Sequence, residues 1–317
     1  MKIDTWYDVF LKALHKKYPK KIKLVEALMD LLLIERETVY RRLRKEVMFP
    51  VEELVKIASA WHISLDETIG IDSDQVSFKV LLSNYFDPSA TQLKYTQNMI
   101  KICNIPGMKY MEVSNKLPRS LTAGFSYIAR YQLLKWMYQF VREEKRILPY
   151  SKIFFPAKIS GLIAEYYKAM KNVEDTTFVW DHKLFEFLAC DIRYFHSIYL
   201  ISDEEKELIK KELHVFLNYM LEVATRGCWP ETGNKVNLYN AQINIDTNYN
   251  YYYSDEFKVC RVHAFGKSEI YSRNPTMIED FVAWMQLKKR VSVKISEADE
   301  KSRIEFFMEQ RQIIDGL

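Results

Sequence analysis

The stretch from Leu24 to Gly70 constrains the fold more than any other part of the chain. It begins LVEALMDLLLIERETVYRRLRKE and continues, from Phe49, as FPVEELVKIASAWHISLDETIG. Apolar residues recur at helical spacing from Leu24 to Leu32, which predicts a helix with one buried face. Breaks follow at Leu33-Ile34 and at Pro50. The pattern therefore predicts four short helices, which must pack on each other because such helices are marginal alone in water.

The second of these helices, at about residues 35–45, combines a small apolar side with a basic one. Val39 and Leu43 are one turn apart and can pack back on the first helix. Glutamates near its start and arginines near its end both suit the helix dipole. On or near its outer face it places a polar and mostly basic set, namely Arg36, Thr38, Tyr40, Arg41 and Arg44, followed by Lys45.

The third and fourth helices have clear start and stop signals. Pro50 suits the first turn of the third helix, which runs through an apolar stripe from Val51 to Trp61. The segment Ser64–Glu67 has the form of a capping box, and Gly70 can end the short helix that follows.

In order, the chain thus has an apolar helix, a turn, Thr38-Val39-Tyr40-Arg41 and the run from Ile57 to Glu67. This combination resembles the lambda-repressor-like, or Xre, helix-turn-helix family, in the N-terminal part only. The chain departs from the family at Leu33, where the family usually has glycine in the turn. It also departs at Glu35, where serine or threonine usually caps the recognition helix.

The resemblance implies a transcriptional regulator whose recognition helix, residues 35–45, enters the major groove of double-stranded DNA. Arg36 and Thr38 would lie near base edges, and Arg41, Arg44 and Lys45 near base edges or phosphates. Arginine suits guanine because its two N–H groups meet O6 and N7 together. Tyr40 would contact a thymine methyl group or a phosphate. We expect a homodimer, because one short helix reads few bases, with half-sites about one DNA turn apart.

The charge distribution agrees with a DNA-binding N-terminal part. Residues 1–50 contain 12 lysines and arginines against 7 aspartates and glutamates, whereas the whole chain carries a formal charge of +4. The remainder is therefore close to neutral and need not meet phosphates.

The rest of the chain predicts a mainly α fold. Only 8 glycines and 48% apolar residues favour helices and a substantial core, and 317 residues suffice for two domains. We expect a helix-turn-helix domain at 1–70, a linker at 71–78 and a mainly helical regulatory or oligomerisation domain at 79–317. The last would contain a small antiparallel β element at about 237–265, short strands at 108–113 and 291–295, and helices at about 90–103, 120–144, 156–171, 181–200, 202–225, 275–287 and 297–314.

Motifs that carry catalytic or metal chemistry are absent from the sequence. There is no HExxH, CxxC, GxGxxG, P-loop or GxSxG, so no cofactor, metal or enzymatic activity is expected. The four cysteines have no zinc-type spacing, and we interpret them as reduced residues of a cytoplasmic, bacterial-type protein. No apolar run is long enough to span a membrane.

Several alternatives stay open. The run Tyr249–Tyr253 suits either a plain strand or stacking on a planar ligand, and Arg261 and His263 could serve a ligand pocket. The effector, a small molecule or a protein, is not identified. A protein-interaction adaptor with a degenerate helix-turn-helix, or an enzyme recruited to nucleic acid, are the alternative functions.

Overall fold

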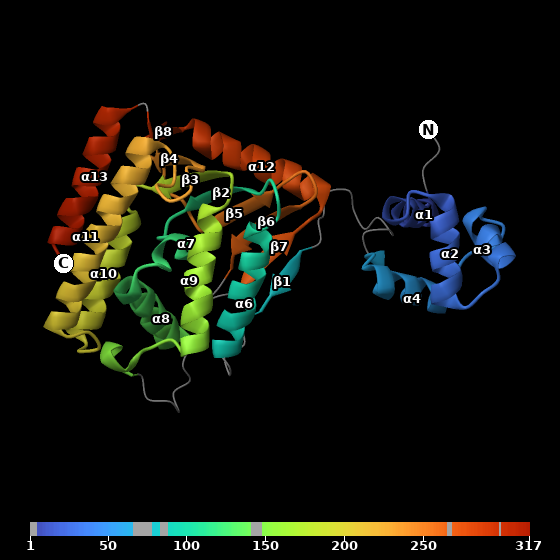
Figure 1. The fold of residues 1–317 in the computed structure, drawn as a ribbon, viewed down its shortest axis with the longest axis horizontal. Coiled ribbons are helices and arrows are strands. Elements are labelled where there is room, and N and C mark those ends of the chain that lie inside the picture. The colour runs from blue at the N-terminus through green and yellow to red at the C-terminus, as the bar shows by residue number, and fades with distance from the viewer. Residues whose placement is uncertain (1–4, 66–77, 83–87, 141–147, 265–267, 298) are drawn as a thin grey trace. The chain divides into compact units, whose positions relative to one another are not determined.

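The computed structural model describes residues 5–65, 78–82, 88–140, 148–264, 268–297 and 299–317. It divides the chain into two compact units, residues 1–77 (unit 1) and 78–317 (unit 2) (Figure 1). The short helix predicted from Ser64 to Gly70 and the linker predicted at 71–78 lie almost wholly outside the described residues.

Unit 1 is a cluster of helices around its own apolar core. Its described helices are α1 (Trp6–Lys17), α2 (Lys21–Leu32), α3 (Arg36–Leu43) and α4 (Val51–Trp61). Thr5 and Asp8 form a capping box at the start of α1. Every helix contributes fully buried side chains to the core, among them Phe10, Leu14, Leu24, Leu28, Val39 and Ile57.

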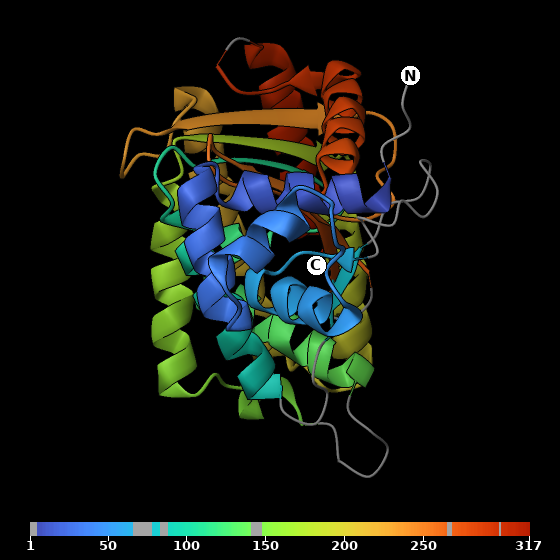
Figure 2. The same cartoon turned by 90° about the vertical axis from the view of Figure 1, so that its right-hand side faces the viewer.

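Unit 2 is built on one eight-stranded mixed sheet. Its strands lie in the order β1-β7-β6-β5-β2-β3-β4-β8. The central strands β2 (Lys109–Ser114), β3 (Asp175–Asp181) and β4 (Lys235–Ala241) pair in parallel, as Figure 2 shows. The antiparallel strands are β1 (Lys79–Leu81), β5 (Tyr249–Tyr253), β6 (Lys258–His263), β7 (Glu269–Ser272) and β8 (Ser292–Lys294).

The prediction of a mainly helical second domain with a small antiparallel β element is therefore wrong. The largest omission is β3, whose residues 175–180 fall between two predicted helices and whose last residue, Asp181, was predicted to begin the second of them. Six of its seven residues are buried, because helices cover both faces of the sheet at this strand. A parallel strand buried on both faces lacks the alternation of apolar and polar residues by which single strands are found.

The helices of unit 2 correspond closely to the predicted ones, with one exception. They are α6 (Pro88–Cys103), α7 (Arg119–Thr122), α8 (Ser126–Phe140), α9 (Ala157–Lys171), α10 (Leu184–Ser197), α11 (Asp203–Arg226), α12 (Pro275–Arg290) and α13 (Glu300–Asp315), with a 3-10 turn at Tyr150–Lys152. The single helix predicted at 120–144 is interrupted between α7 and α8. At this break a Cβ atom on Gly124 would lie 2.6 Å from the Tyr167 ring, so glycine permits the close approach of α9.

Side chains alternate between the two faces of the sheet and build two separate cores. Tyr110 and Tyr252 face the larger core, which includes residues of α6 to α11 and α13. Met111 and Val113 face the opposite side, where they pack with Phe281 and other residues of α12. The polar residues that share the first of these faces therefore lie under the larger helical layer (Figure 1).

Within the described part of the chain, no helix combines the length and the apolar character that crossing a membrane requires.

Candidate functional site

The exposed side of α3 is the first candidate site. Val39 is fully buried in the unit 1 core, whereas Arg36 and Arg41 are exposed and Thr38 is half-exposed. Three residues, Leu33 to Glu35, connect α2 to α3, a length typical of helix-turn-helix units. Leu33 ends α2 in the left-handed conformation at φ 54°. The turn thus has the geometry that favours glycine, although leucine occupies it.

Two arginines of this side have carboxylate neighbours. A guanidinium nitrogen of Arg44 lies 2.7 Å from a carboxylate oxygen of Glu37, and another lies 3.4 Å from Glu46. Arg41 lies 3.5 Å from the other oxygen of Glu46. Exposed pairs of this kind contribute only about 0–1 kcal/mol to stability, so a phosphate can replace the carboxylate at little cost.

Arg36 and Thr38 differ from these arginines, because neither side chain has an ion-pair or hydrogen-bond partner within the described residues. Tyr40 is half-buried, with the ammonium of Lys21 at 5.6 Å and the guanidinium of Arg44 at 6.0 Å from its ring centre. Arg44 of the predicted set and Lys21 from the start of α2 therefore both lie close to the ring of Tyr40.

Lys45 lies beyond the end of α3, which finishes at Leu43 rather than at residue 45. Its backbone is left-handed at φ 65°, and its ammonium group forms an ion pair with Asp8 of α1. Arg42 is also occupied, since it pairs with Glu53 and donates to the Met48 carbonyl. Both cations are therefore engaged with other parts of unit 1.

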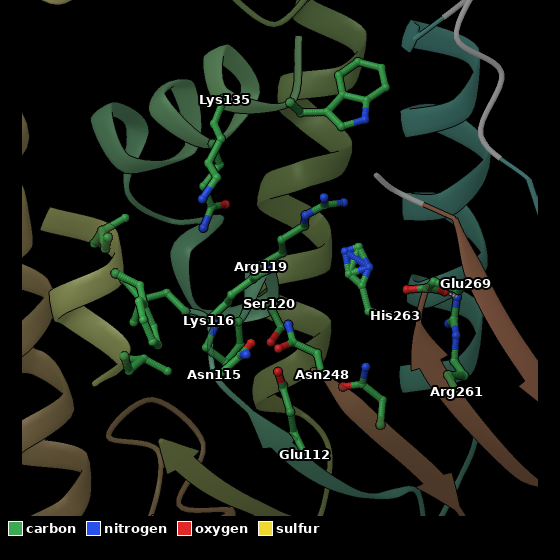
Figure 3. Close-up of a pocket in the computed structure, with 18 of the residues that line it drawn as sticks. Glu112, Asn115, Lys116, Arg119, Ser120, Lys135, Asn248, Arg261, His263 and Glu269 are labelled. Atoms are coloured by element: carbon green, nitrogen blue, oxygen red, sulfur yellow. Dashed lines mark hydrogen bonds and ion pairs between the residues drawn. The ribbon is translucent and has the colours of Figure 1, made fainter. Parts of the chain in front are cut away.

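The second candidate site is a pocket of about 450 Å³ in unit 2 (Figure 3). Its floor is a row of directly paired residues on three neighbouring strands. Glu112 of β2 lies opposite Asn250 of β5, which lies opposite Arg261 of β6. In the next row His263 of β6 lies opposite Glu269 of β7. Strand pairing therefore assembles this polar floor from segments far apart in the sequence.

The walls come from the loop after β2 and from the helices. Figure 3 shows Asn115, Lys116, Arg119 and Ser120 on one side of the pocket and Arg261, His263 and Glu269 on the other. Arg261 forms an ion pair with Glu269 at the floor. An ion pair between Lys135 of α8 and Asp191 of α10 closes part of the wall.

The hydroxyl group of Tyr110 lies between the side chains of Glu112 and Asn250 at the pocket floor. It lies 2.5 Å from a carboxyl oxygen of Glu112 and within hydrogen-bonding distance of the Asn250 side-chain oxygen. One hydroxyl proton cannot serve both acceptors. The conflict is resolved if the Asn250 amide is turned so that its nitrogen donates to the hydroxyl group, or if a protonated Glu112 donates to Tyr110, which then donates to Asn250. Burial raises the pKa of Glu112 to about 7, against a smaller opposing effect of the Tyr110 hydrogen bond, which agrees with the second arrangement.

Most of these pocket residues are absent from the predicted sites, because no sequence motif joins them. The spacing of polar residues could have indicated the site, because residues two apart in a strand lie on the same face. This spacing occurs in Tyr110, Glu112 and Ser114 and in Val259, Arg261 and His263. Of the tyrosine run, Tyr252 lines the pocket. Tyr251 and Tyr253 instead stack on each other on the opposite face, with ring centres 4.7 Å apart.

Comparison with protein-family profiles, with curated proteins and with solved structures gives no significant match for this chain. In the described residues, no group of three or more histidine, cysteine, aspartate or glutamate side chains is placed to hold a metal ion.

Proposed function

We propose that the protein is a sequence-specific DNA-binding transcriptional regulator in which α3 enters the major groove. The observation that carries this proposal is the division of α3 into two sides. Val39 anchors one side in the core, while Arg36, Thr38, Arg41 and Arg44 stand on a surface that a groove can cover. The excess of positive charge in residues 1–50 favours the same surface, because it would attract the phosphate backbone.

The contacts within unit 1 suggest a division of labour among these residues. Arg36 and Thr38 have no side-chain partner to give up in the described chain, so we assign them to base edges. Arg41 and Arg44 would exchange Glu46 and Glu37 for phosphates, and Tyr40 would contact a phosphate or a thymine methyl group. Lys45 would have to leave Asp8 first and is therefore the weakest candidate.

Unit 2 would supply regulation, dimerisation or both. A dimer would place two copies of α3 on half-sites about 10 base pairs apart and so read enough bases for a useful specificity. An effector bound to unit 2 would then change the occupancy of the DNA site.

The test is selection of sites from a random DNA pool by the full chain across a salt series, followed by variants. We expect specific enrichment and a steep loss of affinity with salt. Arg36→Ala should weaken binding to the selected site by about 1–3 kcal/mol and relax the preference at one position. Arg41→Ala should weaken binding to all sequences similarly if it contacts a phosphate.

Lys56→Ala is the matched control, since Lys56 is an exposed cation of the same unit on α4. It should leave affinity close to that of the unmodified protein. Unchanged DNA binding in both arginine variants, with the fold intact, would contradict the assignment of this side of α3 and favour the adaptor function.

A further inference from the structure

Two cations at the pocket of unit 2, Lys116 and Arg119, form no ion pair within the described residues. Neither the Lys116 nor the Arg119 side chain has an ion-pair or hydrogen-bond partner among the described residues, although both line the pocket. The other two cations of the lining differ, since Lys135 is paired with Asp191 and Arg261 with Glu269. Two unpaired like charges at one wall make that wall electropositive.

These positive charges affect the pKa values of His263 and Lys116. Burial and, to a smaller extent, the positive charges of Arg119 and Lys116 lower the pKa of His263 to about 4, so the imidazole is neutral at pH 7. Partial desolvation lowers the pKa of Lys116. The charges of Lys135 and Arg119 act in the same direction, and that of Asp191 opposes them. Lys116 and Arg119 thus act on each other and on His263 across the same space, where an anion would be stabilised by both.

The rest of the lining is mixed. Trp136 and Phe187 are apolar, whereas Gln132, Gln139 and Asp191 are polar, and the volume of about 450 Å³ lies within the range of small-molecule sites. Polar groups in such a pocket give orientation and specificity to a ligand of this size.

We propose that this pocket binds a small organic anion, with its carboxylate or phosphate at the wall formed by Lys116 and Arg119 and its hydroxyl or amino groups among the polar side chains of the lining. This site goes beyond DNA binding and does not depend on it, because every residue that forms it belongs to unit 2.

The first experiment measures thermal unfolding of the full chain in inorganic phosphate against sodium chloride of the same ionic strength. Phosphate at about ten times its dissociation constant should raise the unfolding midpoint of unit 2 by about 2–4 °C beyond the chloride sample. The double variant Lys116→Met/Arg119→Met should lose this shift. Lys101→Met is the matched control, an exposed lysine of α6 in the same unit that should keep the shift. Arg119→Lys, which preserves the charge, should also keep most of it.

A shift of equal size in the double variant would overturn the proposal. The absence of any shift in the unmodified protein at phosphate concentrations up to about 50 mM would overturn it too, because binding weaker than that is not specific enough to define a site. Circular dichroism of each variant separates a lost site from a lost fold. DNA binding enters none of these measurements, so this proposal and the proposed function fail separately.

The second experiment distinguishes the two kinds of anion. Ribose 5-phosphate and gluconate carry hydroxyl groups on a phosphate and on a carboxylate, and ribose is the uncharged comparison. We expect one of the two anions to bind at least tenfold more tightly than inorganic phosphate or acetate, and ribose to bind more weakly than both. The tighter anion identifies the charged group. Equal affinities for the hydroxylated and the simple anions would overturn the role given to the polar side chains of the lining.

Discussion

Burial controls the charge of Glu112, because its carboxyl group lies on the floor of the pocket and is only 3% exposed. Its pKa is raised from an ordinary 4.5 to about 7 in the folded protein. The unfolded chain therefore releases this proton near pH 4.5, while the folded chain holds it to about pH 7. The stability linked to this group is full below pH 4.5 and is lost as the pH rises through 7, because the folded protein must then hold a buried charge.

Glu112→Gln should remove this pH dependence while it keeps a side chain that can bond to Tyr110. We expect the variant to be more stable than the unmodified protein above pH 7, by on the order of 3 kcal/mol, and the difference to shrink toward pH 5. Urea unfolding at pH 5 and pH 8.5 measures it. Glu256→Gln, at an exposed glutamate, is the control and should not alter the pH profile. A difference that is the same at both pH values would show that Glu112 keeps an ordinary pKa.

At the level of the element, Leu33 combines a left-handed backbone with a side chain that is 89% exposed. Leu33→Gly should stabilise unit 1 by about 0.5–1 kcal/mol, because relief of the left-handed strain exceeds the entropy gained by the unfolded chain. Urea unfolding of the full chain, followed at the unit 1 transition, measures the gain. Leu33→Ala separates the causes, since it removes the side chain and keeps the strain, and an equal gain from alanine would refute this explanation. His62 is exposed and follows α4 with a left-handed backbone at φ 55°, so a substitution by glycine there tests the same explanation a second time.

The break between α7 and α8 depends on Gly124. A methyl group there would meet the Tyr167 ring at 2.6 Å, so Gly124→Ala should destabilise unit 2 by about 1–3 kcal/mol. Gly161→Ala is the matched control. Gly161 is an exposed residue of α9 with open space around its Cβ position, and alanine there should add about 0.5–1 kcal/mol through helix propensity. Thermal unfolding of both variants should show shifts of opposite sign, and shifts of the same sign would contradict the contact.

At the level of the whole molecule, each unit contains its own core. The core of unit 1 consists only of residues of that unit, from Tyr7 to Leu65, and the two cores of unit 2 begin at Tyr95. Residues 1–77 alone should therefore unfold cooperatively on heating, as monitored by circular dichroism and by the fluorescence of Trp61, whose ring lies 4.8 Å from that of Tyr18. A gradual, non-cooperative transition would show that unit 1 needs unit 2 for its stability.

The distance along the chain between contacting residues explains which parts of the fold were predictable. Helices depend on contacts three or four residues apart, so the stripes from Leu24 to Leu32 and from Val51 to Trp61 predicted α2 and α4. The helix predicted at 202–225 likewise corresponds to α11, whose start carries a capping box formed by Ser202 and Glu205. In unit 2 the sheet was underestimated, because β3 has no alternation and its partners come from distant segments.

The sequence by itself determined most helices of both units and which residues of α3 can remain outside a core, because these properties depend on local spacing. The break at Gly124 was not predicted, because it depends on contact with α9. Only the tertiary structure decided that Lys45 pairs with Asp8, and only it assembled the pocket. Tyr110 and Asn250 are 140 positions apart and meet because β2 pairs with β5. Strand pairing of this kind depends on which chain segments share a core, and the residues of one strand do not encode the identity of its neighbour.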